Sequence, residues 1–189
     1  MKLYSLPLLL LALLCWTGCD DEDANTLTTL NYDGPNFTAP QLQPGKTTFA
    51  AYFPPGRTEV YNGRDLERVS FYVSAIPQST RVVIYEEGTD DFNPGDIIYQ
   101  RDISARVNQT GWYEDRLPTP VPITGQGLWL TVEVEVGSDN PFALGCDAGN
   151  SYNPNGDLVR VGNTLVFNNF RDLNGETISW NIRGVIGNE

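Results

Sequence analysis

The stretch Leu128-Trp129-Leu130-Thr131-Val132-Glu133-Val134-Glu135-Val136 alternates strictly between two kinds of side chain. Aliphatic residues occupy every second position, and a tryptophan, a threonine and two glutamates occupy the positions between them. Successive side chains of a β-strand point to opposite faces of the sheet, whereas the turn of a helix would scatter these aliphatic residues around its axis. The stretch therefore predicts a strand with one face in an apolar core. Trp129 points away from that face, onto the second face of the sheet or under a loop.

Other parts of the chain extend this pattern. Residues 69–73 alternate in the same way, and Gly162-Asn163 separates two short apolar runs as a two-residue hairpin turn would. Further strands are predicted at 47–53, 80–86, 97–103, 112–117, 158–161, 164–167 and 179–186. Residues 96–110 lack proline and glycine and alternate poorly, so a short helix is the alternative there. About nine strands with short turns predict an all-β fold, an antiparallel β-sandwich of jelly-roll type.

Length and composition narrow the functional classes. The chain has 189 residues, 40% of them hydrophobic, which suits one domain with a packed core. It carries 24 acidic and 12 basic residues, and this excess of negative charge repels phosphate backbones, so we expect no nucleic acid partner. It contains no histidine, which excludes Ser-His and Cys-His nucleophile systems and histidine-based zinc sites. Carboxylate chemistry survives this test, but we expect no enzyme activity.

The first 18 residues predict a signal peptide. Lys2 gives a positive start, and residues 6–16 are almost unbroken in apolar character, which is shorter than the roughly 20 residues that span a bilayer. Two small residues then precede Cys19, an arrangement that resembles the bacterial lipobox. The resemblance implies cleavage before Cys19, a lipid on its sulfur and acylation of the palmitate type, which together hold a protein at a membrane. The alternative is an ordinary secretory signal with an incidental cysteine.

An acidic cluster, Asp20-Asp21-Glu22-Asp23, follows the cysteine. A cysteine followed by such a cluster resembles the export signal of Bacteroidota-type surface lipoproteins, which implies the outer leaflet of the outer membrane and an outward-facing domain. A periplasm-facing anchor, with the acids as a plain spacer, is the alternative. The predicted organisation is a signal peptide over 1–18, a lipid-anchored acidic and polar linker over 19–46, and a β-sandwich domain over 47–189.

Several short motifs occur in an order that resembles a known kind of module. They are Tyr61-Asn62-Gly63, 68–72, 81–85, 94–99, 111–113, 120–123, 128–130, 146–149, 156–158 and 180–185. The order resembles the adhesin-like jelly-roll modules appended to Bacteroidota surface and secreted proteins, often near the C-terminus of peptidases. The resemblance covers about residues 47–187 and implies attachment or binding without catalysis.

The loop over residues 147–157 is the candidate metal site. It combines carboxylates, amides and glycines, and hard cations such as Ca²⁺ prefer oxygen ligands of this kind. The candidate ligands are Asp147, Asn150, Asn155 and Asp157. Asx and glycine residues also form turns for their own sake, and the spacing does not match an EF-hand. Apart from calcium, we expect no cofactor.

Two other groups of residues enter the functional hypothesis. Glu86–Asp91 offers adjacent carboxylates, as a glycosidase would need, although a charged loop between two strands explains it as well. Exposed aromatic residues could form a platform for sugars, whereas buried ones would only fill the sandwich. Cys146 has no partner in the mature chain except Cys19, so we expect a buried small hydrophobe. The leading prediction is a non-catalytic cell-surface module that binds a glycan or a protein, and an accessory subunit of an outer-membrane complex is the alternative.

Overall fold

The computed structural model of the chain describes residues 28–187, which form ten strands, two short α-helices and two 3₁₀ segments. The strands are β1 (Thr28–Leu30), β2 (Gly45–Phe53), β3 (Asp65–Val73), β4 (Ser79–Glu86), β5 (Ile97–Asp102), β6 (Gly111–Pro122), β7 (Leu128–Val136), β8 (Leu158–Val161), β9 (Asn168–Asn169) and β10 (Ile182–Ile186). The α-helices are α1 (Pro55–Thr58) and α2 (Phe170–Asn174), and the 3₁₀ segments are Glu59–Tyr61 and Ser104–Arg106.

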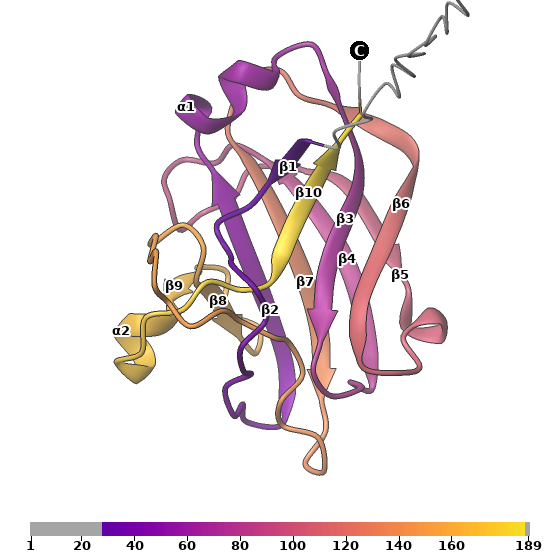
Figure 1. The fold of residues 1–189 in the computed structure, drawn as a ribbon, viewed down its shortest axis with the longest axis vertical. Coiled ribbons are helices and arrows are strands. Elements are labelled where there is room, and N and C mark those ends of the chain that lie inside the picture. Colours follow the sequence, from indigo (N-terminus) through magenta and orange to yellow (C-terminus); the bar gives the residue numbers. More distant parts are fainter. Residues whose placement is uncertain (1–27, 188–189) are drawn as a thin grey trace, which may run out of the picture.

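The strands form two antiparallel sheets that pack face to face. One sheet has the order β1-β10-β3-β6, and the other has the order β5-β4-β7-β2-β8-β9. Figure 1 shows β10, β3 and β6 as a layer in front of β7, β4 and β2. The chain passes back and forth between the sheets in the interleaved order of an eight-stranded jelly roll, with β8 and β9 added beside β2. The predicted all-β jelly-roll sandwich is confirmed.

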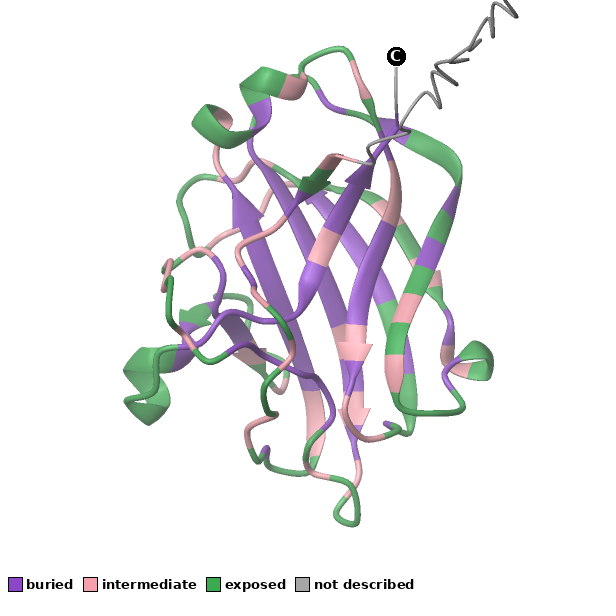
Figure 2. Ribbon diagram, in the orientation of Figure 1, coloured by how far each residue is buried: buried purple, intermediate pink, exposed green. Residues whose placement is uncertain are grey.

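The core lies between the two sheets. The aliphatic face of β7 points into it, and Leu130 and Val132 are fully buried there. Phe49 from one sheet and Trp180 from the segment before β10 meet in this core, with ring centroids 4.7 Å apart in an edge-to-face arrangement. Figure 2 shows the buried residues concentrated along the central strands, while the edge strand β6 has mostly exposed positions and β5 has only intermediate and exposed ones.

A second, smaller apolar cluster covers the outer face of the six-stranded sheet. Trp129 lies at its centre and is fully buried, with Tyr52 stacked on one side at 4.7 Å and Phe167 at 5.3 Å. Phe167 belongs to the loop that connects β8 and β9. Trp129 thus lies on the second face of the sheet and under a loop, which are the two placements that the alternation of β7 predicted.

The predicted linker over residues 19–46 needs correction over residues 28–46. β1 pairs with β10 in the register Thr28↔Ile186, and Leu30 is 1% exposed. In the jelly-roll order β1 is the first of the eight strands, so the domain begins well before residue 47. Three residues are too few to show an alternating pattern, and the partner strand lies at the other end of the chain. Residues 1–27, including the predicted signal peptide and Cys19, lie outside the described residues.

The last part of the chain also differs in detail. β9 forms at Asn168–Asn169 rather than over 164–167, so the connection from β8 is longer than the two-residue turn predicted at Gly162-Asn163. Residues 164–166 are exposed in that connection, and Gly162 has a φ of 68°. The segment over 96–110 forms the strand β5 followed by one 3₁₀ turn, not an α-helix.

Candidate functional site

The two edge strands β5 and β6 face each other across one open side of the sandwich. They belong to different sheets and form no strand pair. At one end a charge cluster closes the gap: the buried carboxylate of Asp115 on β6 accepts a hydrogen bond from the Tyr99 hydroxyl at 2.7 Å. Arg106 lies 2.9 Å and Arg101 3.2 Å from the same carboxylate. Burial, and then the hydrogen bond to Asp115, raises the pKa of Tyr99 to about 12, so this hydroxyl keeps its proton at neutral pH.

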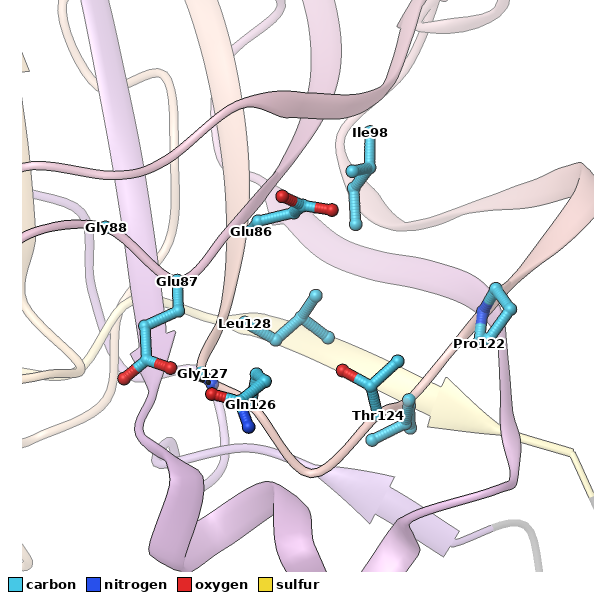
Figure 3. A pocket seen from close by; sticks show the side chains of 10 residues that line it. Glu86, Glu87, Gly88, Ile98, Pro122, Thr124, Gln126, Gly127 and Leu128 are labelled. Carbon is cyan, nitrogen blue, oxygen red and sulfur yellow. Dashed lines mark hydrogen bonds between the residues drawn. The ribbon is translucent and has the colours of Figure 1, made fainter.

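The other end of the gap is open and forms a pocket of about 380 Å³, which we call the groove (Figure 3). Its lining combines two carboxylates, a hydroxyl and an amide with the apolar residues Ile98, Pro122 and Leu128. The polar residues are Glu86, Glu87, Thr124 and Gln126. Figure 3 shows the Glu86 carboxylate directed toward Ile98. A concave site with apolar walls and a few convergent polar groups is typical of ligand binding.

The loop between β4 and β5 holds the two glutamates in place. Its backbone extends the pairing of these strands, because the amide of Glu86 donates to Asp96 and the amide of Gly95 donates back to Glu86. At its tip, the Asp90 carboxylate accepts hydrogen bonds from the Phe92 amide and the Asn93 side chain, which lowers the pKa of Asp90. A Cβ at Gly88 would lie 1.5 Å from a backbone oxygen, so only glycine fits this close approach.

Glu87 connects this loop to the turn between β6 and β7. Its Oε2 accepts a hydrogen bond of 3.2 Å from the Gly127 amide, so one carboxylate of the groove is fixed by the backbone. The hydroxyl of Tyr52 lies behind the same turn, and burial followed by the charge of Glu87 raises the pKa of Tyr52 to about 12. The groove therefore has a rigid floor, while Glu86 is exposed at its edge.

A second hollow of about 460 Å³ continues the groove along β6. The two share Glu86, Ile98, Pro122 and Thr124, and the second adds the proline-rich stretch 118–121 and Tyr99. Prolines have no amide hydrogen to offer a neighbouring strand, which explains how this edge stays unpaired. The combined cleft is elongated and suits an extended ligand better than a compact one.

The aromatic residues divide into buried and exposed groups. Trp129 and Trp180 are fully buried and fill the two apolar clusters. Trp112 on β6 is 42% exposed, and its ring meets that of Tyr72 on β3 edge-on at 5.7 Å. Of the three described tryptophans, therefore, Trp112 alone is available to a ligand at the surface.

The loop over 147–157 has a clear structural function. Asp147 is buried, and its carboxylate accepts hydrogen bonds from the amides of Gly34, Gly149 and Ser179. It thereby connects the loop to the start of the domain and to the segment before β10.

Of the other three candidate calcium ligands, Asn150 lines a hollow together with Asp147, whereas Asp157 has partners of its own. The buried Asp157 carboxylate accepts hydrogen bonds from Asn169 and from the Arg171 amide at the start of α2, and burial raises its pKa. Asn150 is exposed, and the Asn155 amide donates to Asn153 within the turn. Within residues 28–187 no group of three or more acidic, cysteine or histidine side chains has the arrangement of a metal site. The calcium prediction itself stays a prediction.

The remaining sequence predictions concern the cysteines and the membrane. Cys146 is a buried free thiol, as expected, and burial raises its pKa to about 12. Neither α1 nor α2 approaches the length and apolarity of a transmembrane helix, and this finding covers the described residues alone. Lipidation of Cys19 falls outside those residues.

The sequence pointed to part of the groove but not to its opposite wall. Glu86 and Glu87 were candidates because adjacent carboxylates stand out, whereas Thr124 and Gln126 lie in an ordinary turn. The one available signal was Pro118–Pro122, where prolines at alternate positions mark a strand that cannot pair on both sides.

Comparison with known proteins gives similarity at the level of the fold. No protein-family model matches the chain, and no curated protein matches it. Among solved structures, the fold is similar to the crystal structure of the cysteine protease and lectin-like domains of Cwp84, a surface-layer-associated protein of Clostridium difficile, with a TM-score of 0.55 and 12% sequence identity. The match covers 77% of this chain and 32% of that one, so the chain spans about a third of the larger protein. At this identity the similarity shows the fold alone.

Proposed function

We propose that the chain is a non-catalytic carbohydrate-binding module whose ligand lies in the groove between β5 and β6. One observation carries the proposal: the lining of the groove combines apolar residues with carboxylate, amide and hydroxyl groups. A sugar ring has the same mixed character, because its C–H faces are apolar and its hydroxyls donate hydrogen bonds. Glu86 and Glu87 are acceptors for such donors, and the continuation along β6 gives room for more than one ring.

Two further points support a binding function of this kind. The solved structure with the similar fold carries a domain described as lectin-like in a surface-associated protein, which is a fold-level analogy. The sequence contains no histidine, which leaves the groove without a Ser-His or Cys-His nucleophile pair. The predicted lipid anchor on Cys19 would hold the module at the outer membrane, facing outward, and belongs to the same proposal.

Glycan-array binding tests the proposal. A chain that begins at Asp20 keeps every described residue and lacks only the signal peptide and the lipidated cysteine. We expect this chain to bind a subset of oligosaccharides, and Glu86→Gln and Gln126→Ala each to weaken that binding about tenfold, since each removes one polar partner. Glu176→Gln, an exposed glutamate that does not line the groove, is the matched control. Equal binding by all three variants would overturn the assignment of the groove.

Two more measurements address the other parts of the proposal. Chromogenic glycosides should remain intact with the purified chain, because binding without hydrolysis is expected. Mass spectrometry of the protein from its native membrane should find acyl chains on Cys19 as the first residue. A free thiol at Cys19, or Met1 still attached, would contradict the anchoring.

A second candidate function is an accessory subunit of a membrane complex, and one surface favours it. Four exposed aliphatic residues lie on β8, on the connection that follows it, and on α2. They are Val161, Leu165, Val166 and Leu173, and Leu165 is 82% exposed. Val161 and Leu173 line one hollow, and contiguous exposed apolar residues mark interaction surfaces. If this function is correct, a partner cross-linked on cells should be lost with Leu165→Asp and kept with the groove variant Gln126→Ala.

A further inference from the structure

A third hollow lies at the end of the sandwich opposite the groove. The β10 register pairs Ile182 with Phe71 and Ile186 with Leu66, so Thr28 and Gly187, the first and last described residues, lie beside the start of β3. The groove lies at this same end, because Pro122 pairs with Asp65. The third hollow lies where β3 ends and β6 begins, is shallow and widely open to solvent, and has a volume of about 420 Å³. We call it the distal hollow.

The lining of the distal hollow contains no charged side chain. It consists of two aromatic residues, four uncharged polar residues and one alanine: Tyr72, Phe142, Asn36, Thr38, Ser74, Thr110 and Ala39. The chain as a whole has a net charge of −12, whereas the lining of this hollow carries no charge. The hydroxyl and amide groups both donate and accept hydrogen bonds, and the aromatic rings offer flat apolar faces.

Tyr72 is held in place from the side by a chain of contacts. The ring of Trp112 meets it edge-on, and the guanidinium of Arg183 lies 4.1 Å from the centre of the Trp112 ring. Arg183 is itself held by the buried carboxylate of Asp33, with Nη2 and Oδ2 2.7 Å apart. An aromatic surface that is already ordered loses little entropy when a ligand stacks on it.

Two features place Asn36 at the hollow: backbone hydrogen bonds between residues 37–38 and Cys146, and the absence of a side chain at Gly145. Residues 37 and 38 both donate to the carbonyl of Cys146, and Cys146 donates back to Thr38. A Cβ at Gly145 would lie 2.2 Å from the Asn36 side-chain oxygen and 2.8 Å from the ring of Tyr72. Only glycine at this position lets the amide and the ring approach each other.

We propose that the distal hollow is a second carbohydrate site, specific for neutral sugars, in which a pyranose ring stacks on Tyr72 and Phe142. Hydrogen bonds to Asn36, Thr38, Ser74 and Thr110 orient the ring. A charged sugar is disfavoured because no cation lines the hollow, and the nearby Arg183 is already paired with Asp33. The choice of ligand class rests on the proposed function, but the site stands on its own geometry. It faces away from the chain ends, so a module anchored through Cys19 would present it outward.

The experiment measures binding of neutral and charged oligosaccharides to the chain that begins at Asp20. The neutral probes are hexasaccharides of glucose, xylose, mannose and galactose, and the charged probe is oligogalacturonate. Tryptophan fluorescence should detect a ligand that binds in the distal hollow. The ring of Trp112 contacts that of Tyr72, whereas Trp129 and Trp180 are buried. We expect at least one neutral probe to change the emission and oligogalacturonate to leave it unchanged. A Trp112→Phe variant should lose the signal, which identifies Trp112 as its source.

Variants then locate the site. We expect Phe142→Ala and Tyr72→Leu to weaken binding of that probe about tenfold, which is the size of a lost aromatic stacking contact. Phe142 is 44% exposed, so its truncation leaves the fold intact even if Tyr72→Leu fails to fold. Phe92→Ala, at an exposed phenylalanine of the opposite end, is the control.

The outcomes separate the two proposals. If Glu86→Gln removes all binding while Phe142→Ala has no effect, the proposed site in the distal hollow is wrong and the proposed site in the groove is supported. If Phe142→Ala weakens binding and the groove variants do not, the proposed site in the distal hollow is supported and the proposed site in the groove is wrong. Binding of the charged probe alone, or of no probe, overturns the hollow.

Discussion

Asp33 and Arg183 stand 150 residues apart in the sequence and form a two-pronged ion pair, in which Nε and Nη2 of the arginine both donate to the carboxylate at 2.7–3.1 Å. Asn181 donates to the same carboxylate at 2.7 Å. Asp33 is fully buried at its side chain, while Arg183 is 30% exposed. The pair joins the segment after β1 to the last strand, so it connects the first part of the domain to the last.

Removal of this carboxylate should destabilise the protein. Asp33→Ala takes the carboxylate from Arg183 and Asn181, which keep the Gly34 carbonyl as an acceptor, and loss of one partner of a buried pair costs about 3–5 kcal/mol. Because Arg183 still reaches water, we expect about 2–3 kcal/mol in the free energy of unfolding, measured by urea denaturation. The control is Asp172→Ala, which removes an exposed pair with Arg171 and should change stability by about 0.5 kcal/mol or less. Equal effects of the two variants would contradict the role of Asp33.

The corrected domain boundary gives a second prediction. A chain that begins at Thr28 should fold cooperatively, whereas one that begins at Thr47 should not, because it lacks β1, the buried Leu30 and the Asp33 ion pair. Dispersed amide signals in a proton–nitrogen NMR spectrum distinguish the two. A folded chain from Thr47 would show that residues 28–46 are dispensable.

Cys146 predicts a dependence of stability on alkaline pH. Burial raises the pKa of its thiol from 9.0 to about 12, so the folded state keeps this proton while the unfolded state begins to lose it near pH 9. The unfolded state then binds fewer protons, and the free energy of unfolding falls as pH rises from 9 toward 12. Tyrosines with raised pKa values add to the fall only above pH 10.

The comparison with Cys146→Ala isolates the thiol. Between pH 8 and 10 the variant should lose less stability than the parent chain in urea titrations. In the chain that begins at Asp20, Cys146 is the one remaining cysteine, and it should react with iodoacetamide only in denaturant. Rapid alkylation of the folded chain would show that the thiol is accessible.

Calcium should leave the melting temperature unchanged. Asp147 and Asp157 already accept hydrogen bonds from the protein, and calcium would have to compete with these donors. Thermal unfolding followed by circular dichroism, with millimolar calcium chloride and with EDTA, provides the measurement. A stabilisation by calcium that Asn150→Ala abolishes would instead establish the site in the loop over 147–157.

The regular strands could be predicted from the sequence because each has its own alternation of apolar and polar residues. The alternation of β7 predicts its bounds and the separate environment of Trp129. β1 was not predicted, because three residues are too few to show a periodic pattern and because its partner β10 lies at the far end of the chain. β9 escaped for the same reason, since two residues next to α2 show no alternation.

The candidate sites were harder to predict than the strands, because each combines residues that lie far apart in the sequence. The groove combines Glu86 with Thr124 and Gln126, and the distal hollow combines Asn36, Tyr72 and Phe142. Only the jelly-roll connections bring these positions together. Local composition indicated carboxylates and aromatic residues, but it could not say which of them share a surface.

The pairing of the first strand with the last one has a mechanical consequence. A pulling force that enters at Thr28 and is resisted at the distal hollow acts along the axis of the strands, because these two points lie at opposite ends of the sandwich. The β1–β10 hydrogen bonds and the Asp33–Arg183 pair then bear the load together in shear, rather than opening one after another.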